Sequence, residues 1–472
     1  MSRETPLPLD LGADQFTALL DELTPRLAHF IASLASQPAY GTAPTSLDSW
    51  RHEPPPMHGT GFREICDRLL RDVVPHSFNT AAPGYLAYVP GGGLLAAGLA
   101  DLIACVVNRY VGVYAAAPAA VELEMQALRW LAELLGLPAT TGGVTTTGGS
   151  MSAWLAAVAA RERCVPNAIE RATAYVSGEA HHSVERALRL AGVKSAHVRR
   201  VSVDASCRLR VDVLEQLVSE DRARGLAPFF VCGTAGTVNS GAIDPLPELA
   251  AFARREQLWF HVDGAYGGVF AMLPELRARL QGFELGDSIV VDPHKGLFLP
   301  YGTGVLFVRN LDDLQRAFAS HAAYLPPRPE DDRQINYCDH TPELSRDWRG
   351  LRIWLPLALH GAEAFRAALR EKCSLARELC DFVAREPGVE IVAPPELSLF
   401  AFRRRFVGLA RADENARNRD LLARINASQR VMLTGTEIGS VFYLRACVLH
   451  LRTHADRIGE VKEILGREFA RA

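Results

Sequence analysis

Short apolar segments alternate with longer amphipathic segments through the middle of the chain, and this alternation constrains the fold more than any other feature. The pattern predicts strands at 174–177, 197–203, 228–234, 258–262, 288–291 and 304–308. It predicts helices between them at 181–191, 211–224 and 245–255. Strands interleaved with helices indicate a mostly parallel sheet with helices on both faces, and ligands bind outside the carboxyl ends of such strands. We therefore expect an α/β fold.

The two ends of the chain carry different patterns. Residues 14–34 have apolar side chains at helical spacing, interrupted by Pro25, which predicts an amphipathic arm that packs on a partner subunit. Residues 40–56 are rich in Pro, Ser and Thr and predict an extended linker. The expected organisation is an N-terminal helical arm and linker over 1–82, a large ligand-binding domain over 83–350, and a small C-terminal α/β domain over 351–472.

Composition removes several classes of function. The chain has 472 residues, of which 48% are hydrophobic and 22% charged, and its net charge of −3 gives no indication of nucleic acid or an anionic membrane. Nine scattered cysteines without a C-x-x-C pair argue against a disulfide framework and a metal site. The first residues lack the apolar segment of a secretory signal, so we expect a cytoplasmic protein. Residues 91–107 are very apolar but contain Asp101, which favours a buried helix over a membrane span.

A lysine follows the predicted strand 288–291, within the sequence Asp-Pro-His-Lys-Gly of residues 292–296. Lysines in such short segments are usually solvated turn residues. An amine held at the end of a buried strand can instead act as a nucleophile toward a carbonyl group. Lys295 alone does not decide between these interpretations.

Three further features lie at predicted strand ends or helix starts. Asp263 ends an apolar strand, where a carboxylate is costly to bury unless a cation pairs with it. His181 follows the first strand of the alternating region. Residues 142–151 form a glycine- and threonine-rich turn before a helix that extends to about 164, and N–H groups at a helix start can hold a phosphate. Its spacing matches neither common nucleotide-binding pattern, so an ordinary turn remains the alternative.

These features have a joint explanation. A pyridoxal 5′-phosphate site needs a lysine for the aldehyde, a carboxylate for the pyridine nitrogen, N–H donors for the phosphate and a flat group against the ring. Lys295, Asp263, the turn at 148–151 and His181 supply all four. The combination predicts pyridoxal phosphate as the cofactor.

Three sequence strings resemble a known family. They are Gly-Glu-Ala-His-His-Ser-Val-Glu-Arg-Ala at 178–187, His-Val-Asp-Gly-Ala-Tyr-Gly-Gly at 261–268, and Asp-Pro-His-Lys at 292–295. They closely resemble the group II pyridoxal-phosphate-dependent decarboxylases, which include aromatic-L-amino-acid, histidine, glutamate and cysteine-sulfinate enzymes, and the similarity runs from about residue 83 to the C-terminus. The resemblance implies the fold-type I, aminotransferase-like architecture and an obligate homodimer with active sites at the interface. It implies conversion of an L-amino acid to an amine and carbon dioxide through a lysine Schiff base and a quinonoid intermediate.

Roles for individual residues follow from the resemblance. It implies that Lys295 forms the Schiff base, that Asp263 pairs with the pyridine nitrogen, and that His181 stacks on the ring. The remaining implied cofactor contacts are Gly149, Ser150 and Met151 at the phosphate, Thr234 near the phenolic oxygen, Ala265 beneath the ring, and His294 beside the lysine.

A long polar segment at about 328–345 predicts a mobile loop, and such loops are either plain surface loops or functional lids. When residues 347–354 are aligned with the family, Tyr337 falls where its decarboxylases carry the loop tyrosine that protonates the carbanion, reaching over from the other subunit. Relatives with phenylalanine there yield an aldehyde. Tyr337 therefore favours plain decarboxylation, with an aldehyde synthase, aminotransferase or carbon–carbon lyase as alternatives that would keep the same cofactor residues.

The substrate pocket is the least constrained part of the resemblance. Tyr88 and Pro90 match the aromatic-amino-acid enzymes, but Val89, Thr80 and Gly112 stand where an aromatic residue, tryptophan and phenylalanine are usual. Fewer rings are thus expected around the substrate, and a dopa- or tryptophan-type substrate is not specifically indicated.

The sequence does not decide the roles of two arginines, Arg109 and Arg445. Arg109 and the adjacent Tyr110 are candidates for contacts with a substrate side chain, although a surface or interface ion pair is the simpler interpretation for the arginine. Arg445 lies on the last predicted strand and is interpreted as structural.

Overall fold

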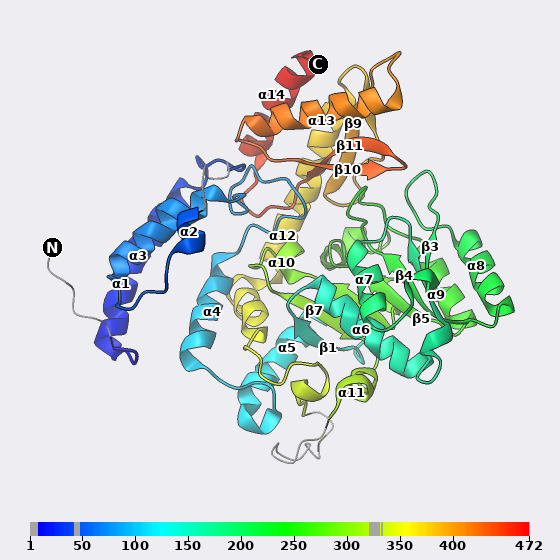
Figure 1. Cartoon of the computed structure of the whole chain (residues 1–472), viewed down its shortest axis with the longest axis horizontal. Helices are drawn as coiled ribbons and strands as arrows, with labels where there is room; N and C mark the ends of the chain where they lie inside the picture. The colour runs from blue at the N-terminus through cyan, green and yellow to red at the C-terminus, as the bar shows by residue number, and fades with distance from the viewer. Residues whose placement is uncertain (1–7, 42–47, 321–330, 332–333, 472) are drawn as a thin grey trace.

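A seven-stranded sheet forms the centre of the molecule (Figure 1). The computed structural model describes residues 8–41, 48–320, 331 and 334–471. The strand order is β1-β7-β6-β5-β4-β2-β3, and all strands run in the same direction except β7, which is antiparallel to both neighbours. The strands are β1 (Gly142–Thr146), β2 (Ala172–Ser177), β3 (Val198–Val201), β4 (Ala227–Thr234), β5 (Trp259–Asp263), β6 (Ser288–Val291) and β7 (Gly304–Val308). The prediction of a mostly parallel α/β sheet is confirmed.

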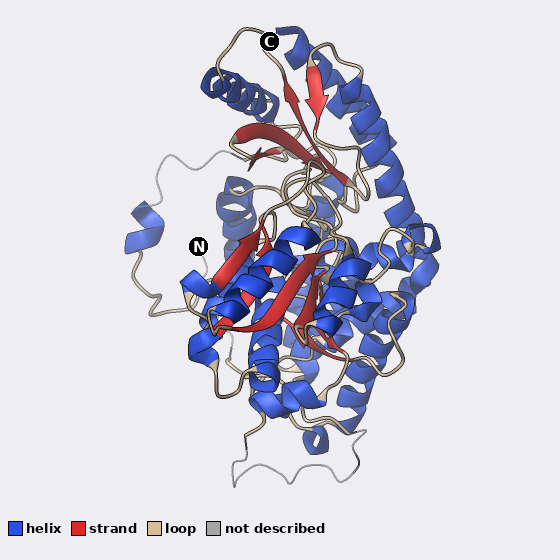
Figure 2. Cartoon of the chain, turned by 90° about the vertical axis from the view of Figure 1, so that its right-hand side faces the viewer, coloured by secondary structure: helices blue, strands red, loops and turns tan. Residues whose placement is uncertain are grey.

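Helices cover both faces of this sheet (Figure 2). On one face lie α6 (Gly149–Cys164), α7 (His182–Leu190) and α11 (Asp312–Phe318). On the other lie α5 (Pro118–Leu134), α8 (Val211–Ala223) and α9 (Leu246–Arg255), with α12 (Gly350–Ala384) packed on α5. Neighbouring residues of β5 enter different cores, Trp259 on the α6 face and Phe260 on the α9 face. Successive side chains of a strand point to opposite faces, so Asp263 belongs to the α6 face.

Strand β1 was not predicted, because residues 142–146 were interpreted as part of a glycine-rich turn. The β-branched residues Val144, Thr145 and Thr146 favour extended backbone, and they pair with β7 from Gly304 to Leu306. Only residues 147–148 remain as the turn before α6. Strand β1 therefore places the start of α6 at the edge of the sheet where the carboxyl ends of β4, β5 and β6 lie.

The C-terminal region forms a second, smaller sheet in the upper part of Figure 1. Its order is β10 (Thr434–Ile438), β11 (Val441–Cys447), β9 (Leu399–Arg404) and β8 (Val389–Ile391), all antiparallel. Helices α13 (Arg411–Ala427) and α14 (Ala455–Arg471) and the end of α12 share its apolar core. Helix α12 bends at Gly361, whose φ of 71° is outside the helical range.

The N-terminal helices lie beside the body of the molecule, away from the large sheet (Figure 1). They are α1 (Ala13–Ser33), α2 (Asp48–His52) and α3 (Phe62–Arg68). An ion pair of 2.8 Å between Arg26 and Asp67 joins α1 to α3. Helix α1 continues through Pro25 and has no fully buried residue, as expected of an arm with little to pack on within its own chain.

The expectation of a buried helix at 91–107 is wrong for the chain by itself. In α4 (Leu95–Val107) only the small residues Ala96, Ala97 and Ala100 are buried, and α4 packs on α12. The large apolar side chains point outward, with exposed fractions from 37% to 58%: Leu95, Leu99, Leu102, Ile103, Val106 and Val107. The sequence pattern predicted the helix, but it does not show which side of the helix packs against other parts of the protein. Within the described parts of the chain, no helix combines the length and apolar character needed to cross a membrane.

Candidate active site

A cavity of about 500 Å³ opens at the carboxyl ends of β4, β5 and β6. It is where the sheet geometry predicts a ligand. Its walls include most of the residues singled out in the sequence: Tyr88, Val89, Gly149, Ser150, Met151, His181, Thr234, Asp263, Ala265, His294 and Lys295. Segments separated by more than a hundred residues therefore converge on one space.

Lys295 lies on the short helix α10 (Pro293–Gly296), which follows β6 directly. Its Nζ atom is 2.9 Å from Oδ2 of Asp292, and its side chain is 24% exposed. The next residue must be glycine, because a Cβ atom at Gly296 would lie 1.9 Å from a methyl carbon of Val269. Close packing beneath α10 thus fixes the direction in which Lys295 enters the cavity.

Asp263 ends β5 and is 8% exposed. Its Oδ1 atom accepts a hydrogen bond of 3.1 Å from the backbone N–H of Ala265. Among the described residues no lysine, arginine or histidine forms an ion pair with this carboxylate. A buried carboxylate without a cation is costly, and a protonated ring nitrogen is a cation that would remove the cost.

His181 caps the N-terminus of α7. Its Nδ1 atom accepts from the backbone N–H of Ser183 at 3.3 Å and lies 2.7 Å from the Ser183 hydroxyl. Burial lowers the pKa of His181, with the Asp263 carboxylate opposing that effect. A neutral, flat ring held at the cavity wall is suited to packing against another ring.

The start of α6 forms the end of the cavity beside Asp292. Thr146 Oγ1 accepts from the N–H of Gly148 at 3.2 Å and lies 2.8 Å from the Ser152 hydroxyl, which fixes the turn. The first N–H groups of a helix have no acceptor within it, which leaves those of Gly149 and Ser150 for a ligand. Met151 was expected to contact the phosphate. Its N–H instead donates to Gly148 O at 3.0 Å and is not available to a ligand.

Gly149 and Asp292 line the corner of the cavity at the start of α6, and they affect a ligand group there in different ways. A Cβ atom at Gly149 would lie 2.9 Å from Oδ2 of Asp292 and 3.3 Å from Cβ of Ala265, so glycine keeps this corner open. The Asp292 side chain is 2% exposed, and its Oδ1 atom has no hydrogen-bond partner. The unsatisfied Asp292 oxygen and the first N–H groups of α6 are therefore available for hydrogen bonds to a ligand in this corner.

Asp292 was missed as a site residue, although its motif was noticed. The signal was available: it is an acidic residue placed directly after a strand as apolar as Ser-Ile-Val-Val. Tyr85 and Tyr301 also line the cavity without having been predicted, and both flank glycine-rich segments. Burial raises the pKa of Tyr85 above its ordinary value and likewise that of Tyr301.

Arg445 lies just behind the cavity wall. It is 3% exposed, its Nε atom donates to the carbonyl of Val238, and one NH1 bond of 3.1 Å reaches Thr434. Its remaining nitrogen has no partner, and no acidic residue among those described pairs with it. Burial lowers the pKa of this guanidinium. Val238 lines the cavity, so an uncompensated positive charge lies next to it.

Four predicted substrate residues lie elsewhere. Thr80 lines a second, mainly apolar cavity of about 340 Å³ beneath α1, which shares only Tyr301 and His294 with the first. Pro90 is buried and does not reach the wall. Arg109 and Tyr110 are exposed beyond the end of α4 and line neither cavity. Within a single chain, therefore, only Tyr88 and Val89 of the predicted substrate residues face the site.

Tyr337 is also outside the cavity of its own chain. It begins a short helical turn, Tyr337–Asp339, and its side chain is fully buried in the large domain. Its hydroxyl has no hydrogen-bond partner among the described residues, and burial raises its pKa well above the usual value. Residues 328–330 and 332–333 of the predicted loop lie outside the described residues. From 334 onward the segment packs on its own domain, and Cys338 N donates to Gly112 O at 3.0 Å.

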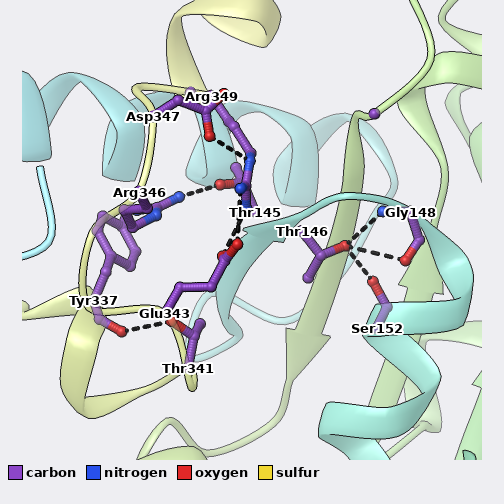
Figure 3. A network of polar contacts seen from close by, with 12 residues as sticks. Thr145, Thr146, Gly148, Ser152, Tyr337, Thr341, Glu343, Arg346, Asp347 and Arg349 are labelled. Atoms are coloured by element: carbon purple, nitrogen blue, oxygen red, sulfur yellow. Dashed lines mark hydrogen bonds and ion pairs between the residues drawn. The ribbon is translucent and has the colours of Figure 1, made fainter. Parts of the chain in front are cut away.

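A buried ion pair holds the segment that follows Tyr337 (Figure 3). Arg346 lies 4.3 Å above the Tyr337 ring and pairs with Glu124 of α5 at 2.6 Å, with both side chains fully buried. Thr145 of β1 donates to the same Glu124 oxygen at 2.7 Å and also contacts Arg346. The neighbouring residue of β1, Thr146, holds the turn at the start of α6. One short strand therefore touches both the Tyr337 region and the site.

The fold and this cavity define a pyridoxal-phosphate-dependent enzyme of fold type I. Residues 56–405 match the family model described as the pyridoxal-dependent decarboxylase conserved domain. The chain belongs to this family of decarboxylases, and its cofactor is pyridoxal phosphate.

Named relatives support this membership. An aromatic-L-amino-acid decarboxylase of Bacillus atrophaeus is 32% identical over 456 residues, covering 96% of this chain and 95% of the relative. A phenylacetaldehyde synthase of Arabidopsis thaliana is 30% identical, covering 88% of this chain and 87% of the relative. Among solved structures, Oryza sativa TDC with PLP and tryptamine is 28% identical, has a TM-score of 0.94 and covers 99% of both chains.

Proposed function

We propose that this enzyme decarboxylates a neutral L-amino acid with an aromatic side chain, releasing the amine and carbon dioxide. The observation that carries the proposal is the convergence of Lys295, Asp263 and His181 with the free end of α6 on one cavity. When bound there, pyridoxal phosphate supplies an electron sink for the bond between the alpha carbon and the carboxylate.

The side-chain preference rests on the cavity walls and on the relatives. Tyr85, Tyr88 and Tyr301 line the space, and the cationic or titratable basic groups on its walls are those assigned to the cofactor: Lys295, His181 and His294. An acidic substrate side chain would therefore meet no further cation on the wall itself, since Arg445 lies behind it, whereas an aromatic side chain meets apolar and aromatic walls. Relatives named as tyrosine and tryptophan decarboxylases of plants share 30% identity with the chain.

Each residue has a defined task in this proposal. Lys295 would provide the amine that holds the cofactor's carbonyl carbon. Asp263 keeps the proton on the pyridine nitrogen, because a buried carboxylate stabilises a cation next to it. His181 stacks on the ring, and the N–H groups of Gly149 and Ser150 hold the phosphate, with Thr234, Ala265 and His294 around the ring. The Arg445 charge behind the wall attracts a substrate that carries a carboxylate.

We assign the proton for the alpha carbon to Tyr337 of a second copy of the chain because the family resemblance implies that role, and the assignment requires the Tyr337 side chain to leave the buried position that it has in this chain. A tyrosine hydroxyl with an ordinary pKa is already protonated at neutral pH, as a proton donor requires. The homodimer is supported by the outward apolar face of α4, since contiguous exposed apolar patches mark interaction surfaces. A partner on α4 would cover the side chains that the single chain leaves exposed.

The decisive test is a panel of L-amino acids assayed for carbon dioxide and amine together. We expect equal amounts of both products from at least one aromatic amino acid, and little turnover of glutamate or cysteine sulfinate. Amine formation from an acidic substrate alone would contradict the proposed side-chain class. Absence of carbon dioxide with every substrate, in protein that has bound cofactor, would contradict decarboxylation.

A second candidate is decarboxylation coupled to oxidative formation of an aldehyde. It is supported by the relative named phenylacetaldehyde synthase and by the position of Tyr337 away from the cavity wall. Replacing Tyr337 by phenylalanine separates the two. If the tyrosine donates the proton, Tyr337→Phe should shift the product from amine to aldehyde and hydrogen peroxide. An unchanged amine yield, or peroxide already formed by the natural protein, would favour a different assignment.

A further inference from the structure

One side-chain amide joins three separate parts of the chain beside the cavity. Asn239 follows Val238, a residue of the cavity wall, in the segment between β4 and α9. Its Nδ2 atom donates to Oε2 of Glu179 at 2.8 Å, and its Oδ1 atom accepts from the Thr436 hydroxyl at 2.7 Å. Glu179 lies two residues before His181, and Thr436 lies on β10 of the small sheet. The cavity wall, the turn that carries His181 and the small domain therefore meet at Asn239.

The chemistry of the two partners fixes the orientation of the Asn239 amide. An ionised carboxylate only accepts hydrogen bonds, so the NH2 group of Asn239 must face Glu179. The amide oxygen is then left for the Thr436 hydroxyl, which can donate. In the described parts of the protein, no other side chain bonds the Glu179 carboxylate and no basic residue forms an ion pair with it. Asn239 is thus the group that holds the Glu179 side chain.

The small domain contacts the same wall segment at two further points. The Nε atom of Arg445 on β11 donates to the carbonyl oxygen of Val238. A Cβ atom at Gly241 would lie only 3.0 Å from the carbonyl oxygen of Leu399 on β9. Residues 238–241 are therefore packed directly against the small sheet, and a shift of the small domain must move this part of the cavity wall.

The turn that carries His181 is attached to the large domain at both ends. At its start, Gly178 N donates to Val201 O of β3 at 2.8 Å. At its end, Nδ1 of His181 bonds Ser183 at the start of α7. The Glu179 side chain lies between these points and is the tie from the turn to the wall segment. Without this tie, His181 would keep its attachment to α7 but lose its fixed position relative to the opposite wall.

We propose that Asn239 is a positioning residue, which holds the His181 ring in place for stacking by tying its turn to the cavity wall and the small domain. The inference rests on the proposed function, in which His181 stacks on the cofactor's ring. Asn239 is not among the residues that line the cavity, so it acts through Glu179. Stacking depends on the separation and tilt of two rings, and a displacement of about 1 Å can lower turnover while the cofactor stays bound.

Asn239→Asp tests the bond to Glu179 with almost no change of shape. The variant keeps an acceptor for Thr436 but places a second carboxylate against Glu179, and both positions are half-buried, so the two charges repel. We expect kcat to fall about tenfold and KM to stay within about twofold. Circular dichroism of the bound cofactor in the visible range, measured without substrate, should lose amplitude relative to its absorbance. This signal reports the asymmetric surroundings of the ring, which a general loss of stability would not change.

A second substitution restores the bond with donor and acceptor reversed. When Glu179→Gln is combined with Asn239→Asp, the amide at 179 donates to the carboxylate at 239, and the net charge equals that of the natural protein. We expect kcat to return to within about threefold of the natural value and the dichroism to recover. Thr436→Val removes only the tie to the small domain and should weaken both signals less. The matched control is Asn415→Asp on α13, which bonds Ser440 O away from the cavity and should leave both unchanged.

The outcomes separate the role of Asn239 from the proposed function. Full turnover and dichroism in Asn239→Asp, a double variant no better than Asn239→Asp, or an equal loss in Asn415→Asp would each overturn the proposal. Unchanged signals in Thr436→Val would contradict the link to the small domain. His181→Ala should also lose dichroism, and an unchanged signal there would overturn the stacking role itself. Loss in His181→Ala without loss in Asn239→Asp would contradict only the present inference, and the amino-acid panel tests the reaction independently.

Discussion

The two ends of strands β4, β5 and β6 carry cavities of similar size and opposite character. The cavity at the carboxyl ends measures about 500 Å³, and one at the amino ends measures about 640 Å³. Three of the four arginines that line the amino-end cavity are paired with acids, namely Arg163 with Asp313 and Asp287, Arg222 with Glu256, and Arg309 with Asp287, and the fourth, Arg254, is exposed to solvent. At the carboxyl ends, Asp263 has no cation among the described residues and Arg445 has no acid. Volume therefore does not mark the site, whereas charge that the protein leaves uncompensated does.

The largest effect is expected from Lys295→Ala. Removal of the amine that holds the cofactor should lower turnover by at least about a thousandfold, because no other lysine lines the cavity. Steady-state release of carbon dioxide measures the loss, and the yellow colour of the purified protein should disappear. Arg309→Ala, at the amino ends of the strands, should change turnover by less than about twofold. Equal losses in both variants would break the distinction between the two ends.

The next largest effect concerns stability. Arg346→Met leaves Glu124 as a buried charge without a cation, and breaking such a pair costs about 3–5 kcal/mol. Urea unfolding should therefore show a free energy of unfolding lower by that amount. The matched change Arg163→Met affects a half-exposed ion pair at the amino-end cavity and should cost less than about 1 kcal/mol. A small loss for Arg346→Met would mean that the buried network contributes less than its geometry indicates.

Asp263→Asn should have a smaller but specific effect. The amide cannot stabilise a proton on the pyridine nitrogen, so turnover should fall about a hundredfold while bound cofactor remains visible by absorbance. Asp287→Asn is the matched control, because Asp287 lies at the amino-end cavity and accepts from Phe260 N at 2.9 Å. We expect this control to keep turnover within about threefold. Unimpaired turnover in Asp263→Asn would contradict the role of the carboxylate.

The smallest effect is expected at Thr80, which shares a hydrogen bond with Tyr301 at the boundary between the first and second cavities. Thr80→Trp should fill part of the 340 Å³ space beneath α1. We expect kcat/KM for a tryptophan-type substrate to fall about tenfold relative to a phenylalanine-type substrate, since small differences in apolar fit are worth about 1–3 kcal/mol. Unchanged relative rates would show that substrates do not approach the second cavity.

The sequence predicted the position of those residues whose place in the fold follows from the sequence pattern around them. Lys295 and Asp263 each follow an apolar strand, and parallel strands end at a common edge, so both side chains were expected to meet. Helices such as α7 and α9 agree with the predicted ranges to within one or two residues. His181 and the turn before α6 could be placed for the same reason, because each follows directly on a strand.

The remaining parts depend on pairing between distant segments. With 51 basic and 54 acidic residues, nothing local selects Arg346 as the partner of Glu124, which is 222 residues away. The same holds for Tyr337, whose burial beneath Arg346 follows from that pair. Helix α4 was predicted from its apolar composition, but nothing local indicates that its large apolar side chains are exposed in this chain. Thr80 was grouped with Tyr88, although Tyr301 separates their cavities.

The pairing of β1 has a consequence for the order in which the protein is made. Within the large sheet β1 contacts only β7, so residues 142–146 have no strand partner until residues 304–308 have been synthesised. Gly304, the first residue of β7, lies against Gly148 so closely that a Cβ atom would be 2.5 Å from its Cα. At about 5–20 residues per second, a ribosome needs roughly 10–30 seconds to supply the missing segment. The nascent chain therefore cannot complete the cofactor end of β1 until residues 304–308 have been synthesised.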